Sequence, residues 1–202
     1  MCNFKIDDNM VNILVPAIFA LIGIVLGNYI SNRNANLLFI TQKKFELRHR
    51  SYSKIMGLRV PLIQTIQMQL EAKILTEYYH ARYIRLSNLD GVLEQSKSEY
   101  KRAIELQPTT SSYIKELYEA IGEVSISYNL INSLESKLND FYNFQFSSLE
   151  IKPIDMQTIN SEDDLENYKQ NASSNMYKLL HTAYDKKIKD IIEELDKQLR
   201  QK

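Results

Sequence analysis

Residues 10–31 read MVNILVPAIFALIGIVLGNYIS, and this stretch decides the predicted fold. The uncharged run around it extends from Asn9 to Asn32. A helix of that length rises about 36 Å, which exceeds the roughly 30 Å hydrocarbon core of a bilayer. Its apolar side chains leave no polar face, and a helix that is apolar all round is buried in protein or in lipid. The remaining chain has only narrow apolar stripes, so we predict a single transmembrane helix at residues 10–31.

The flanks of this helix predict its orientation. Residues 31–60 carry seven basic side chains against one acid, whereas the N-terminal tail sets Lys5 against Asp7 and Asp8. Because Lys and Arg are enriched on the cytoplasmic side of membrane helices, we expect the tail outside and the C-terminus in the cytoplasm. The nearly neutral start and the missing A-x-A-like exit argue against a cleaved signal peptide. The predicted location is therefore the cell (inner) membrane, in a single pass.

Two sets of residues near the membrane are candidate contact sites. Gly23, Gly27 and Ser31 form a G-x-x-x-G stripe extended by one small residue, which favours close helix pairing and a homo-oligomer. The second set is basic and is expected to contact lipid head groups: Arg33, Lys43, Lys44, Arg48 and Arg50.

Composition narrows the function classes. The formal net charge is zero, so no nucleic-acid partner is expected. The single cysteine, Cys2, excludes an intramolecular disulfide and a cysteine-based zinc cage. Five glycines and four prolines leave few turn signals, which favours long helices. Abundant Ile, Asn, Lys and Tyr without Trp is typical of an AT-rich bacterial or phage-derived gene.

Beyond the anchor, apolar periodicity predicts helices. A basic juxtamembrane helix should break near Gly57 and Pro61, and a second helix should run from Pro61 to a turn at 87–91. A third, more polar helix from Val92 to Leu106 should end at Gln107-Pro108. Thr110 or Ser111 should then cap the most amphipathic helix. The apolar positions of that helix define a coiled-coil-like bundle seam: Ile114, Leu117, Ile121, Val124, Tyr128, Ile131 and Leu138.

The C-terminal part is predicted as an irregular crossing at 143–160, with a short extended piece at 149–151, followed by a long last helix. Ser161 with Asp164 should cap this helix, and Asp185–Lys189 and Glu193–Lys197 should support it as i,i+4 pairs.

The predicted fold is all-α: a single N-terminal transmembrane helix followed by a cytoplasmic antiparallel helical bundle with coiled-coil-like long helices. Its divisions are an extracytoplasmic tail (1–9), the transmembrane helix (10–31), the juxtamembrane helix (32–60) and the bundle (61–202).

No phosphate-binding loop, dinucleotide fingerprint, nucleophile elbow or H-E-x-x-H motif is present. Two E-x-x-H pairs, Glu46/His49 and Glu77/His80, have the spacing found in di-iron bundles, which would need further carboxylates from Glu105, Glu116 or Glu123. However, His80 points away from the apolar face of its helix, and Glu46 lies in a basic run that would repel a dication. The pairs are better interpreted as solvated polar faces, so we expect no metal and no cofactor.

These observations favour a non-enzymatic, membrane-anchored helical interaction module that tethers or assembles a cytoplasmic protein partner, or itself, at the membrane. One alternative is a membrane-perturbing effector of a bacterial toxin or phage-defence system, and another is a di-metal carboxylate-histidine bundle enzyme.

Overall fold

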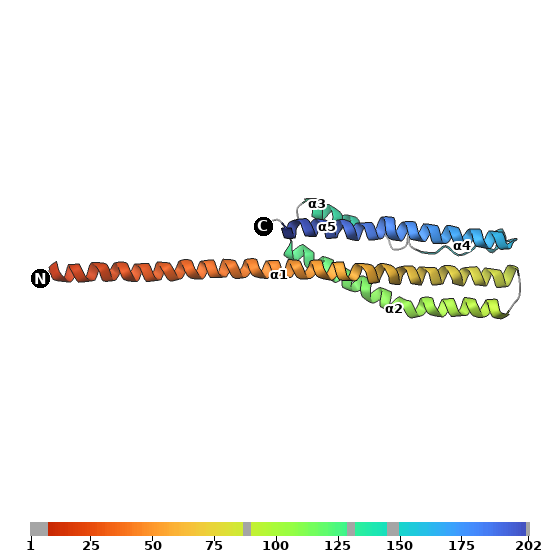
Figure 1. Ribbon diagram of the computed structural model, residues 1–202, viewed down its shortest axis with the longest axis horizontal. Helices are drawn as coiled ribbons and strands as arrows, with labels where there is room; N and C mark the ends of the chain where they lie inside the picture. The colour runs from red at the N-terminus through yellow and green to blue at the C-terminus, as the bar shows by residue number, and fades with distance from the viewer. Residues whose placement is uncertain (1–7, 87–89, 129–131, 145–149, 201–202) are drawn as a thin grey trace, which may run out of the picture. The chain divides into compact units, whose positions relative to one another are not determined.

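The structure is a computed structural model (Figure 1), and it describes residues 8–86, 90–128, 132–144 and 150–200. For residues 8–15, 17, 90 and 132 it describes the backbone alone. All regular secondary structure within these residues is helical, so the prediction of an all-α protein is confirmed. The α-helices are α1 (Asp8–Arg85), α2 (Asp90–Ser127), α3 (Asn132–Tyr142), α4 (Glu162–Tyr177) and α5 (Lys186–Arg200). A 3-10 turn, η2 (Met156–Thr158), precedes α4, and a π-helical segment, η3 (Lys178–Asp185), joins α4 to α5.

The chain forms two compact units, Met1–Glu46 and Leu47–Lys202. The boundary falls inside the predicted juxtamembrane helix, because residues from Leu47 onward pack with the bundle. Ile55 and Leu58, which precede the predicted start of the bundle at residue 61, belong to its core.

The described residues of the first unit, from Asp8 to Glu46, form the N-terminal part of α1. Each side chain that the structure describes in it is exposed, including large apolar residues such as Phe19 and Leu38, both 69% exposed. Within the residues that the structure describes, no helix is long and apolar enough to cross a membrane. The predicted span includes residues 10–15 and 17, whose side chains lie outside the described set. The transmembrane helix therefore stays a prediction.

The second unit is a helical bundle whose neighbouring long helices run antiparallel. Ser96 near the start of α2 contacts Thr76 of α1, and Ser127 at its end contacts Arg48. Contacts of α4 and η3 with α1 run the same way, from Glu162 against Arg82 to Asp185 against Arg59. Helix α3 packs against α5. One core cluster joins all of these helices, and its largest fully buried side chains are Tyr184, Phe141, Ile55 and Leu62.

The break predicted near Gly57 and Pro61 is wrong, because α1 continues through both residues. Proline removes one hydrogen bond and costs a helix interior about 3 kcal/mol. The apolar face of α1 runs unbroken across this point through Ile55, Leu58 and Leu62, all buried in the core. Burial of such side chains contributes about 1.5–3 kcal/mol each, which outweighs the local cost.

The helix end predicted at Gln107-Pro108, with a new cap at Thr110 or Ser111, is also wrong. Helix α2 passes through Pro108, and the Thr110 hydroxyl donates to the Leu106 carbonyl instead of capping a new helix. Where the sequence predicts one helix from Ile114 to Leu138, the structure divides it, since α2 ends at Ser127 and α3 begins at Asn132.

The segment before α4 is irregular in its described residues apart from η2, as predicted. Of the predicted extended piece, residue 149 lies outside the described residues, while Glu150 and Ile151 form no strand. The cap is confirmed: Asp164 N donates to the Ser161 hydroxyl, and the Asp164 carboxylate accepts from Ser161 N at 2.9 Å.

The π-helical segment follows from the spacing of apolar residues in the last helix. Ala172, Met176, Leu180, Tyr184 and Ile188 recur at steps of four, whereas a regular α-helix needs alternating steps of three and four to keep one face inward. In a regular α-helix, side chains four residues apart rotate gradually away from the core. A π-helical turn contains more residues, which offsets this rotation and keeps Leu180, Tyr184 and Ile188 buried.

Candidate interaction surfaces

The small-residue stripe of the first unit faces open space. Gly23, Gly27 and Ser31 are exposed, and a Cβ added to either glycine would meet nothing within 4 Å. Packing within this chain therefore gives no reason for glycine at either position. A closely packed second helix would give one.

The five residues predicted to contact lipid head groups have different environments. Arg33, Lys43, Lys44 and Arg50 are exposed, and Lys43 pairs with Glu46 at 2.8 Å. Arg48 is half-buried in the second unit, where its Nε donates to the Ser127 carbonyl at 2.8 Å. The guanidinium of Arg48 thus lies at the C-terminal end of α2, where a cation is stabilised by the helix dipole. It also lies 5.6 Å from the centre of the Tyr128 ring.

The bundle-seam residues lie in the core of the second unit. Leu117, Ile121, Val124, Tyr128 and Leu138 are buried, and Ile114 is half-buried against the same cluster. Ile131 lies outside the described residues. Burial raises the pKa of Tyr128, and its hydroxyl donates to the Arg48 carbonyl at 2.8 Å. The seam therefore contributes to folding the unit rather than to its surface.

An ion pair between half-buried Arg59 and buried Asp185 joins α1 to η3. Arg59 Nε donates to Asp185 Oδ1 at 2.6 Å and its Nη2 donates to Oδ2 at 3.0 Å, while Lys189 Nζ lies 3.1 Å from Oδ2. Burial raises the pKa of the Asp185 carboxyl, but the hydrogen bonds and charges of Arg59 and Lys189 outweigh burial, so the net pKa is lowered. The predicted Asp185–Lys189 pair is confirmed. No local pattern in the sequence indicates Arg59 as a partner of Asp185, because the two residues are 126 positions apart.

A second buried carboxylate, Glu194 of α5, binds α3. Lys137 Nζ and the Ser133 hydroxyl contact it at 3.1 and 2.9 Å, and these hydrogen bonds lower its pKa. Lys197 pairs with Glu194 at 3.5 Å, so it is engaged at i,i+3 instead of at the predicted i,i+4 partner Glu193.

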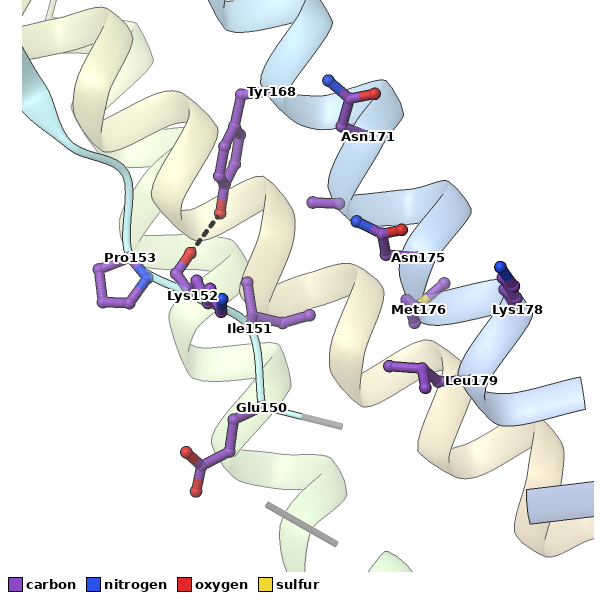
Figure 2. Close-up of a pocket in the computed structure, with 11 residues that line it drawn as sticks. Glu150, Ile151, Lys152, Pro153, Tyr168, Asn171, Asn175, Met176, Lys178 and Leu179 are labelled. Atoms are coloured by element: carbon purple, nitrogen blue, oxygen red, sulfur yellow. Dashed lines mark hydrogen bonds between the residues drawn. The ribbon is translucent and has the colours of Figure 1, made fainter. Parts of the chain in front are cut away.

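A groove of about 650 Å³ lies between α4–η3 and the irregular segment before α4 (Figure 2). Apolar side chains of Ile151, Ala172, Met176 and Leu179 line it, and Met176 is buried. Its polar lining comprises Asn171, Asn175 and Lys178 on the helical side and Glu150 and Lys152 on the other side. The Tyr168 hydroxyl donates to the Lys152 carbonyl at 3.0 Å and so links the two walls (Figure 2). Burial, with the charge of Glu77 adding to it, raises the pKa of Tyr168 to about 12.

The carboxylates of the two E-x-x-H pairs bind other groups of the protein. Glu46 pairs with Lys43, and the Glu77 carboxylate accepts from Ile154 N at 3.3 Å. His49 and His80 are exposed. Of the additional carboxylates, Glu123 accepts from the Ser51 hydroxyl at 3.4 Å, Glu116 from the Ser112 hydroxyl at 3.2 Å, and Glu105 pairs with Lys101. No group of three or more His, Cys, Asp or Glu residues that could hold a metal occurs among the described residues.

Comparison of the chain with protein-family models, with curated proteins and with solved structures finds no match. Fold and surface together define an all-α protein with an exposed apolar helix in one unit and a separate helical bundle in the other.

Proposed function

We propose that this chain is a membrane-anchored, non-enzymatic interaction module. In this proposal the anchor occupies residues 10–31, the C-terminal bundle lies in the cytoplasm, and the bundle holds a protein partner at the membrane. The observation that carries the proposal is the difference between the two units. The second has a complete core of its own, whereas the first exposes large apolar side chains from Ile18 to Ile30.

So many exposed apolar side chains are unfavourable in water, and burying them in an apolar environment stabilises the protein. Fully burying a Leu, Ile, Val or Phe side chain contributes about 1.5–3 kcal/mol. Nine of the thirteen residues from Ile18 to Ile30 are large and exposed, and they lie on all sides of the helix except the stripe that contains Gly23 and Gly27. A second helix covers one stripe, whereas lipid covers all sides. The uncharged run from Asn9 to Asn32 supports the same covering.

The proposal includes self-association through Gly23, Gly27 and Ser31. Open space around both glycines leaves room for close approach of a second copy. Small-residue and polar contacts between membrane helices contribute about 1–2 kcal/mol, so the assembly is expected to be weak without further contacts.

Reporter fusions test the orientation. An enzyme that is active only in the cytoplasm, fused after Lys202, should be active, and one that is active only outside should be silent. Fusions of both reporters to a chain with the exposed Arg33, Lys43 and Lys44 replaced by Gln provide the comparison, because the basic flank is what sets the expected orientation. The opposite pattern for the unaltered chain would refute the cytoplasmic location of the bundle.

A further inference from the structure

The groove between α4–η3 and residues 150–153 has no role in the packing of the bundle. Its volume of about 650 Å³ lies within the range of about 300–1,000 Å³ that is usual for ligand sites. Met176, Ile151 and Leu179 provide an apolar lining, and Met adapts its shape to different apolar partners. Water in contact with these side chains would be released by an apolar group placed there.

Asn171 and Asn175 provide a regular polar edge along this apolar surface. Both side chains are exposed, and within the described residues neither amide is hydrogen-bonded to the protein. Each amide offers donors and an acceptor, which matches the peptide group of another chain. The two residues lie one helical turn apart, a rise of about 6 Å. Alternate residues of an extended chain, which point the same way, repeat at about 6.6 Å.

The charged residues of the groove favour extended peptides of complementary charge. Lys178 follows Asn175 on the helical wall, and Lys152 lies on the opposite wall, against the single acid Glu150 (Figure 2). Lys152 and Lys178 are exposed, so their long side chains can reach a carboxylate beside the apolar lining. A peptide with an acidic side chain near Lys178 complements this distribution.

We propose that this groove binds an extended segment of a partner protein. Asn171 and Asn175 hydrogen-bond its backbone, an apolar side chain of the segment rests on Met176, and an acidic side chain pairs with Lys178. The inference rests on the proposed function and assigns the docking site and the chemistry of the partner.

The test selects binders with a displayed library of random short peptides, using the full-length chain in lipid nanodiscs. The expected peptides share an apolar and an acidic residue, and a synthetic peptide of that sequence is then titrated. Asn171→Ala and Asn175→Ala should each weaken its binding about five- to tenfold, which is the size expected for one lost hydrogen bond. Asn139→Ala, an exposed amide on α3, is the matched control and should leave the Kd unchanged.

A charge reversal on the protein, compensated by a charge reversal on the peptide, provides a second test. Lys178→Glu should weaken the same peptide, and replacement of the acidic peptide residue by Lys should restore binding to that variant only. All four positions are exposed, so unchanged circular dichroism and melting temperature are expected for each variant. The proposal is overturned if no peptide is enriched, if the two amide variants bind as tightly as the unaltered chain, or if a second copy of the chain is found in the groove. Each of these results leaves the reporter assay for the anchor unaffected, so the two proposals fail separately.

Discussion

Asp185 is a buried carboxylate that links η3 to α1. It is held by Arg59 and Lys189, so its pKa is lowered. Leaving one partner of a partly buried, charge-assisted hydrogen bond unsatisfied typically costs about 1–3 kcal/mol, and the half-buried Arg59 keeps part of its contact with water. Asp185→Asn should therefore lower the free energy of unfolding by about that amount at neutral pH, measured by urea denaturation. Arg59→Met combined with Asp185→Leu should recover most of the loss, and a double variant as unstable as the single one would contradict this account.

The same carboxylate predicts a pH dependence. A group whose pKa is lower in the folded state stabilises the fold above its unfolded pKa, about 3.9 for Asp, and loses this contribution as pH falls through the folded value. Glu194, whose pKa is also lowered, acts in the same direction. Stability should therefore be level above about pH 5 and decline below about pH 4. In the Asp185→Asn variant the decline should be shallower, and an equally steep decline would show that Asp185 does not contribute to it.

Among the helices, α1 differs most from its prediction. If it is continuous at Gly57, as the structure shows, Gly57→Ala should stabilise the protein by about 0.5–1 kcal/mol, because glycine is unfavourable within a helix and an added Cβ meets nothing within 4 Å. Gly122→Ala in α2 is the matched control, since both the sequence and the structure place it inside a helix. A gain at residue 122 without one at 57 would indicate a break in α1.

Burial of the bundle-seam residues depends both on α2 and on the helices that pack against it. Ile121 is fully buried in the core cluster, so Ile121→Asp should cost about 2–5 kcal/mol through lost burial and an unpaired charge. Ser125→Asp, four residues along α2 but exposed, should cost less than about 1 kcal/mol, the size of the unfavourable interaction of an acid with the C-terminal end of a helix. Similar losses at both positions would show that Ile121 is not in the core.

Periodicity predicted which faces are buried better than where helices end. The stripes through Ile121 and Ile188 are in the core, and the Ser161 cap forms because its donors and acceptors are local in sequence. The prolines at 61 and 108 misled the prediction, because the packing that outweighs their cost comes from distant segments. The Arg59–Asp185 pair and the groove beside Met176 depend on residues far apart in sequence, which no local pattern brings together.

At the scale of the whole molecule, the second unit should fold without the first. Its core cluster contains residues from Ile55 to Leu195, and none of the side chains that the structure describes in the first unit belongs to it. A chain of residues 47–202 should therefore be helical by circular dichroism and unfold cooperatively in urea. A gradual transition would show that the first unit is needed for the fold.

Self-association should depend on the small-residue stripe. In a Cys2→Ser background, single cysteines at 23, 27 and 31 should cross-link more readily than those at 25 and 29, which lie on another side of the helix. Gly23→Ile with Gly27→Ile should abolish the cross-link formed from position 31. Equal cross-linking around the helix would instead indicate a monomeric tether.

The proposed function requires that residues 10–31 anchor the chain in a membrane. This requirement is tested most directly by washing isolated membranes with alkaline carbonate and measuring where the full-length chain is found. A variant with Ile22→Asp and Leu26→Asp is the control, because a charge at the centre of a membrane helix costs about 2.5–3.5 kcal/mol. The unaltered chain is expected to stay with the membranes, whereas the variant is expected to be released. Release of the unaltered chain would contradict the proposed function.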